Sequence, residues 1–426
     1  MAQVHNPIHR NLLVVVGLLL AATVAGMVAL WPATEELPET EEPPEPLVSA
    51  TILEVERFTA DVDPDLGISG EQADVVVEIH EGPDEGEVIA LESIHLDGFP
   101  EISEGDRVKL TPASTPEGDR QYFISDFERL PVLGILLAIF VLAVLLIGRW
   151  HGLRSLIGLS LSLLVVVQFI VPAILAGQSP PMVALVGSVA IMIVTLYLTH
   201  GLNEMTTAAA IGTSLALIVT VALGTGFVSL GKVTGFASEQ AVFARFAVDG
   251  LDLRGMVLAG LIIAALGVLD DVTISQSSTV FALHDTDRRL TWATLFARAM
   301  KVGRDHIAAV INTLFLVYAG ASLALLVLFS TGGLGLREII NSEIIAEEVI
   351  KIVVGSLGLI AAVPITTALA SWVAVRRPED APPLGGGHFH GPVPGQPPVA
   401  SAAPAATGGG DGSEGPEGPD REHDGH

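Results

Sequence analysis

Eight apolar segments divide this chain, and their lengths restrict its fold more than any other feature. A helix that crosses a membrane needs about 20 consecutive apolar residues, and most of these segments approach or exceed that length. Only 16% of the residues are charged, against about 25% in a typical soluble domain. We therefore predict an α-helical polytopic membrane protein with about eight transmembrane helices. The predicted spans are residues 11–31, 130–147, 156–176, 182–198, 208–230, 256–269, 307–329 and 349–375.

The first span has two interpretations. An apolar run near the N-terminus can be a cleaved signal peptide, but this run is long for one, and Trp31 and Pro32 make a poor cleavage site. A retained anchor over residues 1–31 is therefore favoured. Loops and helix ends on one side of the predicted spans carry about twice as many Lys and Arg residues as those on the other side. By the positive-inside rule, both termini are cytoplasmic.

The remaining segments lie outside the predicted seven-helix domain of residues 130–377. Residues 32–46 form a Pro/Glu linker, and residues 378–426 form an acidic tail rich in Gly and Pro, which is typical of disorder. Between them, residues 47–129 contain five short Val- and Ile-rich runs separated by turns, which predicts a small extracytoplasmic all-β domain, for which an OB-like barrel is one candidate. Inside the seven-helix domain, residues 291–305 have the pattern of a cytoplasmic amphipathic helix, which either lies on the inner leaflet or packs on a loop.

Two adjacent carboxylates, Asp270 and Asp271, follow the apolar run of residues 256–269 and are the principal candidate site. A charge in a membrane segment is costly, and it usually faces a protein interior or a water-filled cavity. One interpretation is therefore a cavity whose oxygen atoms bind a proton or a hard cation. The other is that both aspartates are solvated just beyond the membrane, at the start of the next helix. The sequence favours neither interpretation over the other.

Polar residues in neighbouring segments could support the aspartates. At helical spacing, Asp305 and Asn312 project to the same side, and so do Thr206 and Thr213. These hydroxyl and amide groups could line a cavity, although joining helices by hydrogen bonds is the commoner role. The supporting residues are Thr273, Ser277, Arg304, Asp305, Asn312, Thr313, Asn203, Glu204, Thr206 and Thr213.

Other chemistry has little support in the sequence. The chain has no cysteine, which excludes disulfides, thiolate metal sites and cysteine nucleophiles. No catalytic motif and no cofactor-binding motif is present, so we do not expect an enzyme or a bound cofactor other than a cation. The net charge of −27, with few basic and aromatic residues, disfavours nucleic acid as a partner.

Several blocks of sequence resemble the YibE/F-like family of bacterial multi-pass membrane proteins. They are residues 122–129 with 149–155, 200–213, 267–271 with the Ser-rich continuation, and 303–320. The resemblance extends over roughly residues 50–375. It implies a multi-pass protein of the bacterial plasma membrane, and it marks six motif positions without assigning them roles. These positions are Asp270, Asp271, Arg304, Asp305, Asn312 and Thr313.

Together these features predict a cation- or proton-coupled transporter or channel-like protein. Its expected partners are the lipid bilayer, an inorganic ion or small solute, and a second copy of itself. The alternative is a non-transporting scaffold or sensor whose external β domain binds a partner in the cell envelope.

Overall fold

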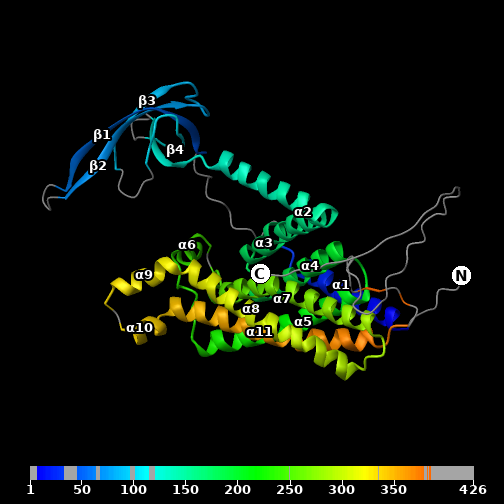
Figure 1. Cartoon of the computed structure of the whole chain (residues 1–426). Helices are drawn as coiled ribbons and strands as arrows, with labels where there is room; N and C mark the ends of the chain where they lie inside the picture. Colours follow the sequence, from blue (N-terminus) through cyan, green and yellow to red (C-terminus); the bar gives the residue numbers. More distant parts are fainter. Residues whose placement is uncertain are drawn as a thin grey trace, which may run out of the picture. The chain divides into compact units, whose positions relative to one another are not determined.

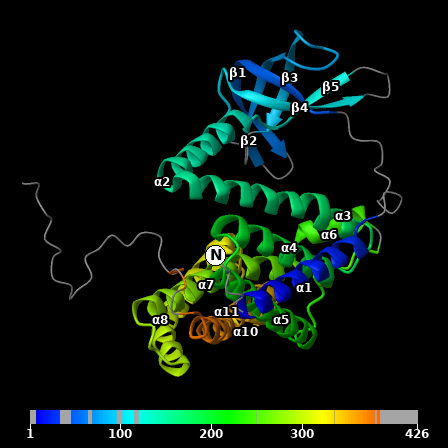
Figure 2. The ribbon, with the colours of Figure 1, turned by 90° about the vertical axis from the view of Figure 1, so that its right-hand side faces the viewer.

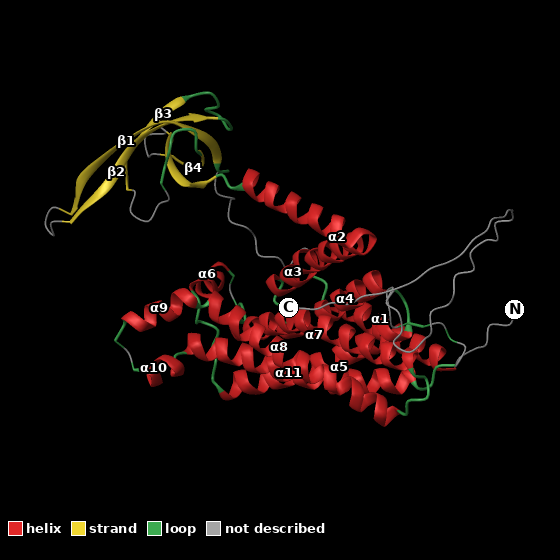
Figure 3. Ribbon diagram, viewed as in Figure 1, coloured by secondary structure: helices red, strands yellow, loops and turns green. Residues whose placement is uncertain are grey.

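The computed structural model describes residues 7–32, 46–63, 68–95, 101–114, 120–248, 250–333, 335–378, 381 and 383–384. Most of the predicted linker and almost all of the predicted tail lie outside these residues. The described part contains a small antiparallel sheet, followed along the chain by a set of long helices (Figure 3). The sheet and the helices are described separately below.

All five predicted strands are present, and each is longer than its predicted run, the first two most of all. The strands are β1 (Val48–Asp63), β2 (Ile68–Ile79), β3 (Val88–His95), β4 (Arg107–Ser114) and β5 (Arg120–Phe127). They form one sheet in the order β3-β2-β1-β4-β5, with antiparallel neighbours (Figure 2). Val48, Ala50 and Ile52 alternate along β1 toward a shared apolar core, as expected for a strand with one covered face. The described pairings leave β3 and β5 as the outer strands.

A polar network connects the β2–β3 turn to the other end of the sheet. The Tyr122 hydroxyl on β5 donates to Oδ2 of Asp84 at 2.5 Å, and the Arg120 guanidinium lies 3.7 Å from the same oxygen. Burial and the hydrogen bond to Asp84 raise the pKa of Tyr122 to about 12. This link fixes the turn against the last strand before the helices begin.

The helices after the sheet follow the predicted apolar segments. The long ones are α2 (Leu130–Val165), α4 (Pro180–His200), α5 (Glu204–Leu230), α7 (Leu253–Thr286), α8 (Trp292–Ala321) and α11 (Glu343–Ala374). The shorter ones are α3 (Val171–Leu175), α6 (Glu239–Ala247), α9 (Leu323–Thr331) and α10 (Leu336–Asn341), and a π-helical turn, Val166–Ile170, joins α2 to α3. One further helix, α1 (Pro7–Ala29), precedes the sheet.

Five of the described helical segments are long and apolar enough to cross a membrane, or six if the bent pair α8–α9 is one span. One of the five, Leu130–Leu175, has 46 residues, about 69 Å of helix at 1.5 Å per residue. A backbone break at Arg149, with φ of 49°, divides it where the sequence predicts a loop between two spans. The predicted total of eight crossings, and their orientation, stay predictions.

Three helices, α5, α7 and α11, form the centre of the helical part and lie side by side (Figure 1). Small residues permit their close approach. A Cβ on Gly212 of α5 would meet Thr366 of α11, and a Cβ on Gly358 of α11 would meet Thr220 of α5. The apolar core between the three helices includes Leu217 of α5, and α4 and α8 pack against its sides.

Helix α8 differs from its prediction. The segment 291–305 is helical from Trp292, and Thr291 caps its first turn by accepting a hydrogen bond from the backbone N–H of Thr294. However, it is not a separate amphipathic segment, because it continues without a break into the predicted seventh span. The helix axis bends by 60° only where α8 passes into α9.

Candidate functional site

Asp270 and Asp271 lie near the middle of α7, not at its end. The Ser- and Thr-rich residues that follow them continue the same helix to Thr286. The pair is therefore not the N-cap or first turn of a new helix, as one interpretation of the sequence had it. The continuation stays helical because Thr273 and Ser277 are buried against neighbouring helices.

The two aspartates have different surroundings. Asp271 is exposed, whereas Asp270 is half-buried and faces α4. Oδ2 of Asp270 accepts a hydrogen bond from the Thr195 hydroxyl at 3.2 Å, and that hydroxyl also lies within 2.9 Å of the Ile191 carbonyl in its own helix. The other oxygen, Oδ1, is buried and has no hydrogen-bond partner among the described residues. Asp270 thus presents one uncompensated carboxylate oxygen to the interior.

A pair of buried hydroxyls joins α5 to α7 next to Asp270. The hydroxyls of Thr213 on α5 and Thr273 on α7 are 2.5 Å apart, and Thr213 also donates to the Ala209 carbonyl at 3.0 Å. The Thr273 hydroxyl contacts the backbone carbonyl of Asp270 at 3.2 Å. These contacts hold α5 and α7 together one helical turn from the carboxylate.

A second buried polar contact joins three helices. The Gln276 amide on α7 donates to the Thr367 hydroxyl of α11 at 2.8 Å and to the Ala299 carbonyl of α8 at 3.0 Å. At the next position of the helix, the Ser277 hydroxyl donates to the Met205 carbonyl of α5 at 2.8 Å. Thr273, Gln276 and Ser277 therefore pair with protein groups, in contrast to Oδ1 of Asp270.

The predicted supporting residues on α8 do not surround Asp270. All four are exposed, and none has a described hydrogen bond or ion pair to Asp270 or Asp271. The four residues are Arg304, Asp305, Asn312 and Thr313. Helix α8 packs through Leu295, Ala299 and Gly303, which lie on a different face. These four residues therefore do not form a site with Asp270, although Asp305 and Asn312 do share one side of α8. A cavity between α7, α8 and α11 is present, but it is lined by Leu261, Leu314 and Tyr318 among others, and not by these residues.

The beginning of α5 carries the other predicted residues. Asn203 caps this helix, since its Oδ1 accepts from the backbone N–H of Thr206 at 2.9 Å and from the Thr206 hydroxyl at 3.2 Å. Glu204 forms an ion pair with Arg377, whose Nε lies 2.7 Å from Glu204 Oε2. These residues stabilise one end of the bundle and do not contact Asp270.

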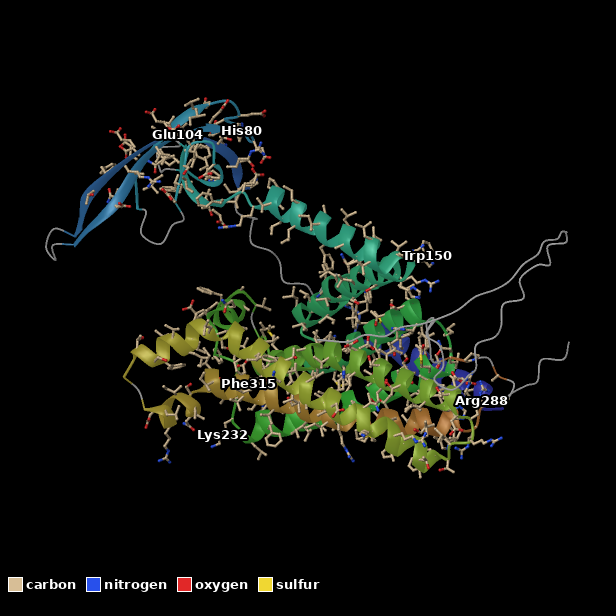
Figure 4. All side chains as sticks on the ribbon, viewed as in Figure 1. His80, Glu104, Trp150, Lys232, Arg288 and Phe315 are labelled. Atoms are coloured by element: carbon tan, nitrogen blue, oxygen red, sulfur yellow. The ribbon has the colours of Figure 1, made fainter. Side chains whose placement is uncertain are left out.

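Arg377 also connects this end to the C-terminal part of α7. Its Nη1 lies 3.5 Å from Oδ1 of Asp285, and its guanidinium lies 5.7 Å from the ring centroid of Phe281. Arg288, labelled in Figure 4, lies 3.3 Å from the same Asp285 oxygen and donates to the Ala381 carbonyl at 2.7 Å. We call Glu204, Asp285, Arg288 and Arg377 the charged cluster.

Comparison with known proteins supplies a family. The family model described as YibE/F-like protein matches residues 136–376, more than half of the chain. The chain belongs to the YibE/F-like family. No curated protein and no solved structure matches it. The expected resemblance from residue 50 onward is too broad, because the match starts inside α2 and leaves out the β domain.

The sequence did not single out three positions, two within the YibE/F-like region and one directly after it. Thr195 is one of three hydroxyl residues in a predominantly apolar segment, with Ser188 and Tyr197, and nothing in its spacing connects it to Asp270. Gln276 lies inside the polar stretch already selected, so its amide could have been included. Arg377 follows directly after the YibE/F-like match and appears in the sequence as an ordinary basic flank of a span.

Proposed function

We propose that this YibE/F-like membrane protein is a transporter or channel-like protein that binds a proton or a monovalent cation at Asp270. The observation that carries the proposal is Oδ1 of Asp270, which is buried between helices with no protein partner among the described residues. Family membership and the apolar helices support the membrane setting.

The energetics favour an occupant for this oxygen. Placing an ionised carboxylate at the centre of a membrane helix costs about 2.5–3.5 kcal/mol, and such groups commonly mark ion or proton pathways. The cost is removed when the carboxyl takes up a proton, and it is reduced when a cation binds. The Thr195 hydroxyl holds only Oδ2, so Oδ1 is available to the occupant.

The oxygen ligands available at Asp270 favour a proton or a small monovalent cation over a divalent cation. Calcium sites use six to eight oxygen ligands with several carboxylates. Here one half-buried carboxylate has a hydroxyl neighbour, and the adjacent Asp271 is exposed. This donor set suits a proton, or a sodium-like ion with part of its hydration shell. The proposed setting is the bacterial plasma membrane, with cytoplasmic termini and an extracytoplasmic β domain.

A second candidate is a scaffold or sensor that transports nothing. The contacts Thr213–Thr273 and Gln276–Thr367 favour it, because they show buried polar side chains joining helices. In that case the β domain would bind an envelope partner. Asp270 distinguishes the two candidate functions, because its buried Oδ1 forms no hydrogen bond between helices and so has no role in joining them.

The experiment compares Asp270→Asn with Asp271→Asn. Both variants keep the shape of the side chain and remove its charge, and Asp271 is the exposed neighbour on the same helix. The purified proteins are reconstituted into vesicles, and proton, sodium and potassium flux is followed with ion-sensitive dyes. Wild type and Asp271→Asn are expected to give flux, whereas Asp270→Asn falls to the background of protein-free vesicles. Equal flux from both variants, or no flux of these ions from folded wild type, would overturn the proposal.

A further inference from the structure

One side of α8 is exposed along its whole length and carries polar groups. Lys301, Asp305, Ala308, Asn312 and Leu316 follow at intervals of three or four residues, so they line one side of the helix. All five are exposed in the single chain. We call these five residues the α8 stripe.

The part of the α8 stripe from Ala308 to Leu316 lies within the predicted seventh span. No Lys, Arg, Asp or Glu occurs between Asp305 and Arg337. Asn312 lies seven residues beyond Asp305, about 10 Å along the helix. Exposed apolar side chains follow it, including Phe315, labelled in Figure 4, and Leu316, which are 58% and 61% exposed. The Asn312 amide therefore faces a region where lipid offers it no hydrogen bond.

We propose that a second copy of this chain covers the α8 stripe, with the two α8 helices packed side by side about a two-fold axis normal to the membrane. Two copies inserted in the same orientation have parallel helices, so each stripe residue meets its counterpart at the same depth. Interfaces of this symmetry must be complementary to themselves.

The chemistry of the stripe is self-complementary at each level. A carboxamide both donates and accepts, so two Asn312 side chains can hydrogen-bond to each other. One helical turn away, Ala308 is small and permits close approach of the two backbones. At the membrane boundary, Asp305 of one copy lies beside Asp305 of the other, and Lys301 and Arg304 of both copies lie within about one helical turn, where their positive charges offset this like-charge contact. These three residues have no ion pair within the described single chain. An unrelated partner would need to match this pattern by chance.

The natural lack of cysteine gives a direct test. Single substitutions Ala308→Cys and Asn312→Cys are made in the full chain, and native membranes are oxidised and analysed on non-reducing gels. The matched control is Ile218→Cys, because Ile218 lies on α5, another predicted span, and is 56% exposed. The stripe variants are expected to form a disulfide-linked dimer, whereas the control stays monomeric.

Several outcomes would overturn the proposal. Monomeric Ala308→Cys and Asn312→Cys would show that this face is covered by lipid or another protein. Equal cross-linking of Ile218→Cys would indicate random collision. As a second measurement, Asn312→Leu keeps a lipid-compatible surface and is expected to lower the dimer fraction seen by single-molecule photobleaching, and an unchanged fraction contradicts the role of the amide. Neither readout depends on ion flux through Asp270.

Discussion

Replacing Arg377 with alanine should destabilise the helical part more than any exposed substitution nearby. The Arg377 side chain is 4% exposed, and those of its acidic partners Glu204 and Asp285 are 10% and 8% exposed. Removing one member of a buried pair leaves an uncompensated charge and costs about 3–5 kcal/mol. In the variant, Asp285 retains Arg288 at 3.3 Å. We therefore expect a loss in the free energy of unfolding at the lower end of this range, about 3 kcal/mol, which arises mainly because Glu204 is left without its partner.

The neighbouring Arg376 is the matched control. It is exposed, and its guanidinium lies 4.5 Å from the ring centroid of Trp372. A contact of this kind at an exposed site contributes about 0.5–1 kcal/mol. The free energy of unfolding is measured for Arg377→Ala and Arg376→Ala in mixed micelles by denaturant titration. The double variant Arg377→Ala with Glu204→Gln should recover part of the loss, because the orphaned charge is gone. A difference below about 1 kcal/mol between the two single variants, or no recovery in the double variant, would refute the reasoning.

Two further perturbations test the sheet and the helix packing. Because the folded pKa of Tyr122, about 12, lies above its ordinary value of 10.0, the protonated phenol contributes stability below pH 10 that is lost as the pH rises through 12. Absorbance titration of wild type minus Tyr122→Phe should show tyrosinate forming near pH 12, and a midpoint near 10 would contradict the buried contact with Asp84. Gly212→Ala places a Cβ against Thr366, 3.2 Å from its Cα, and should cost about 1–3 kcal/mol. Gly226→Ala in the same helix meets nothing within 4 Å and should be neutral or slightly stabilising, so equal unfolding midpoints for the two variants would contradict the tight α5–α11 contact.

The sequence predicted where the helices and strands lie along the chain better than which face of each helix packs against the bundle. Alternating apolar residues located β1, because alternation in one strand is enough to define a covered face. On α8, the seven-residue interval between Asp305 and Asn312 correctly placed them on one side of the helix. It could not tell whether that side faces the bundle, because this depends on which face offers small residues for packing. In α8 those residues are Ala299 and Gly303.

Asp270 illustrates the same limit. Its acidic character made it a candidate from the sequence, but its position within a helix depends on burial of the residues after it. Serine, threonine and glutamine end a helix or continue it according to what they contact. Here the contacts of Gln276 and Ser277 with α5, α8 and α11 explain why the helix continues past Asp270. The ion pair of Arg377 with Glu204 joins residues far apart in the chain, and no local pattern indicates it.

The Gln276 amide has a mechanical consequence for any working cycle. Because one side chain bonds both Ala299 and Thr367, a slide of α7 against either α8 or α11 breaks one of these hydrogen bonds. The amide therefore favours movement of the three helices together. The hydrogen bond of Asp270 to α4 is a single contact at 3.2 Å, so a motion that uncovers the carboxylate on the α4 side breaks fewer of these polar contacts.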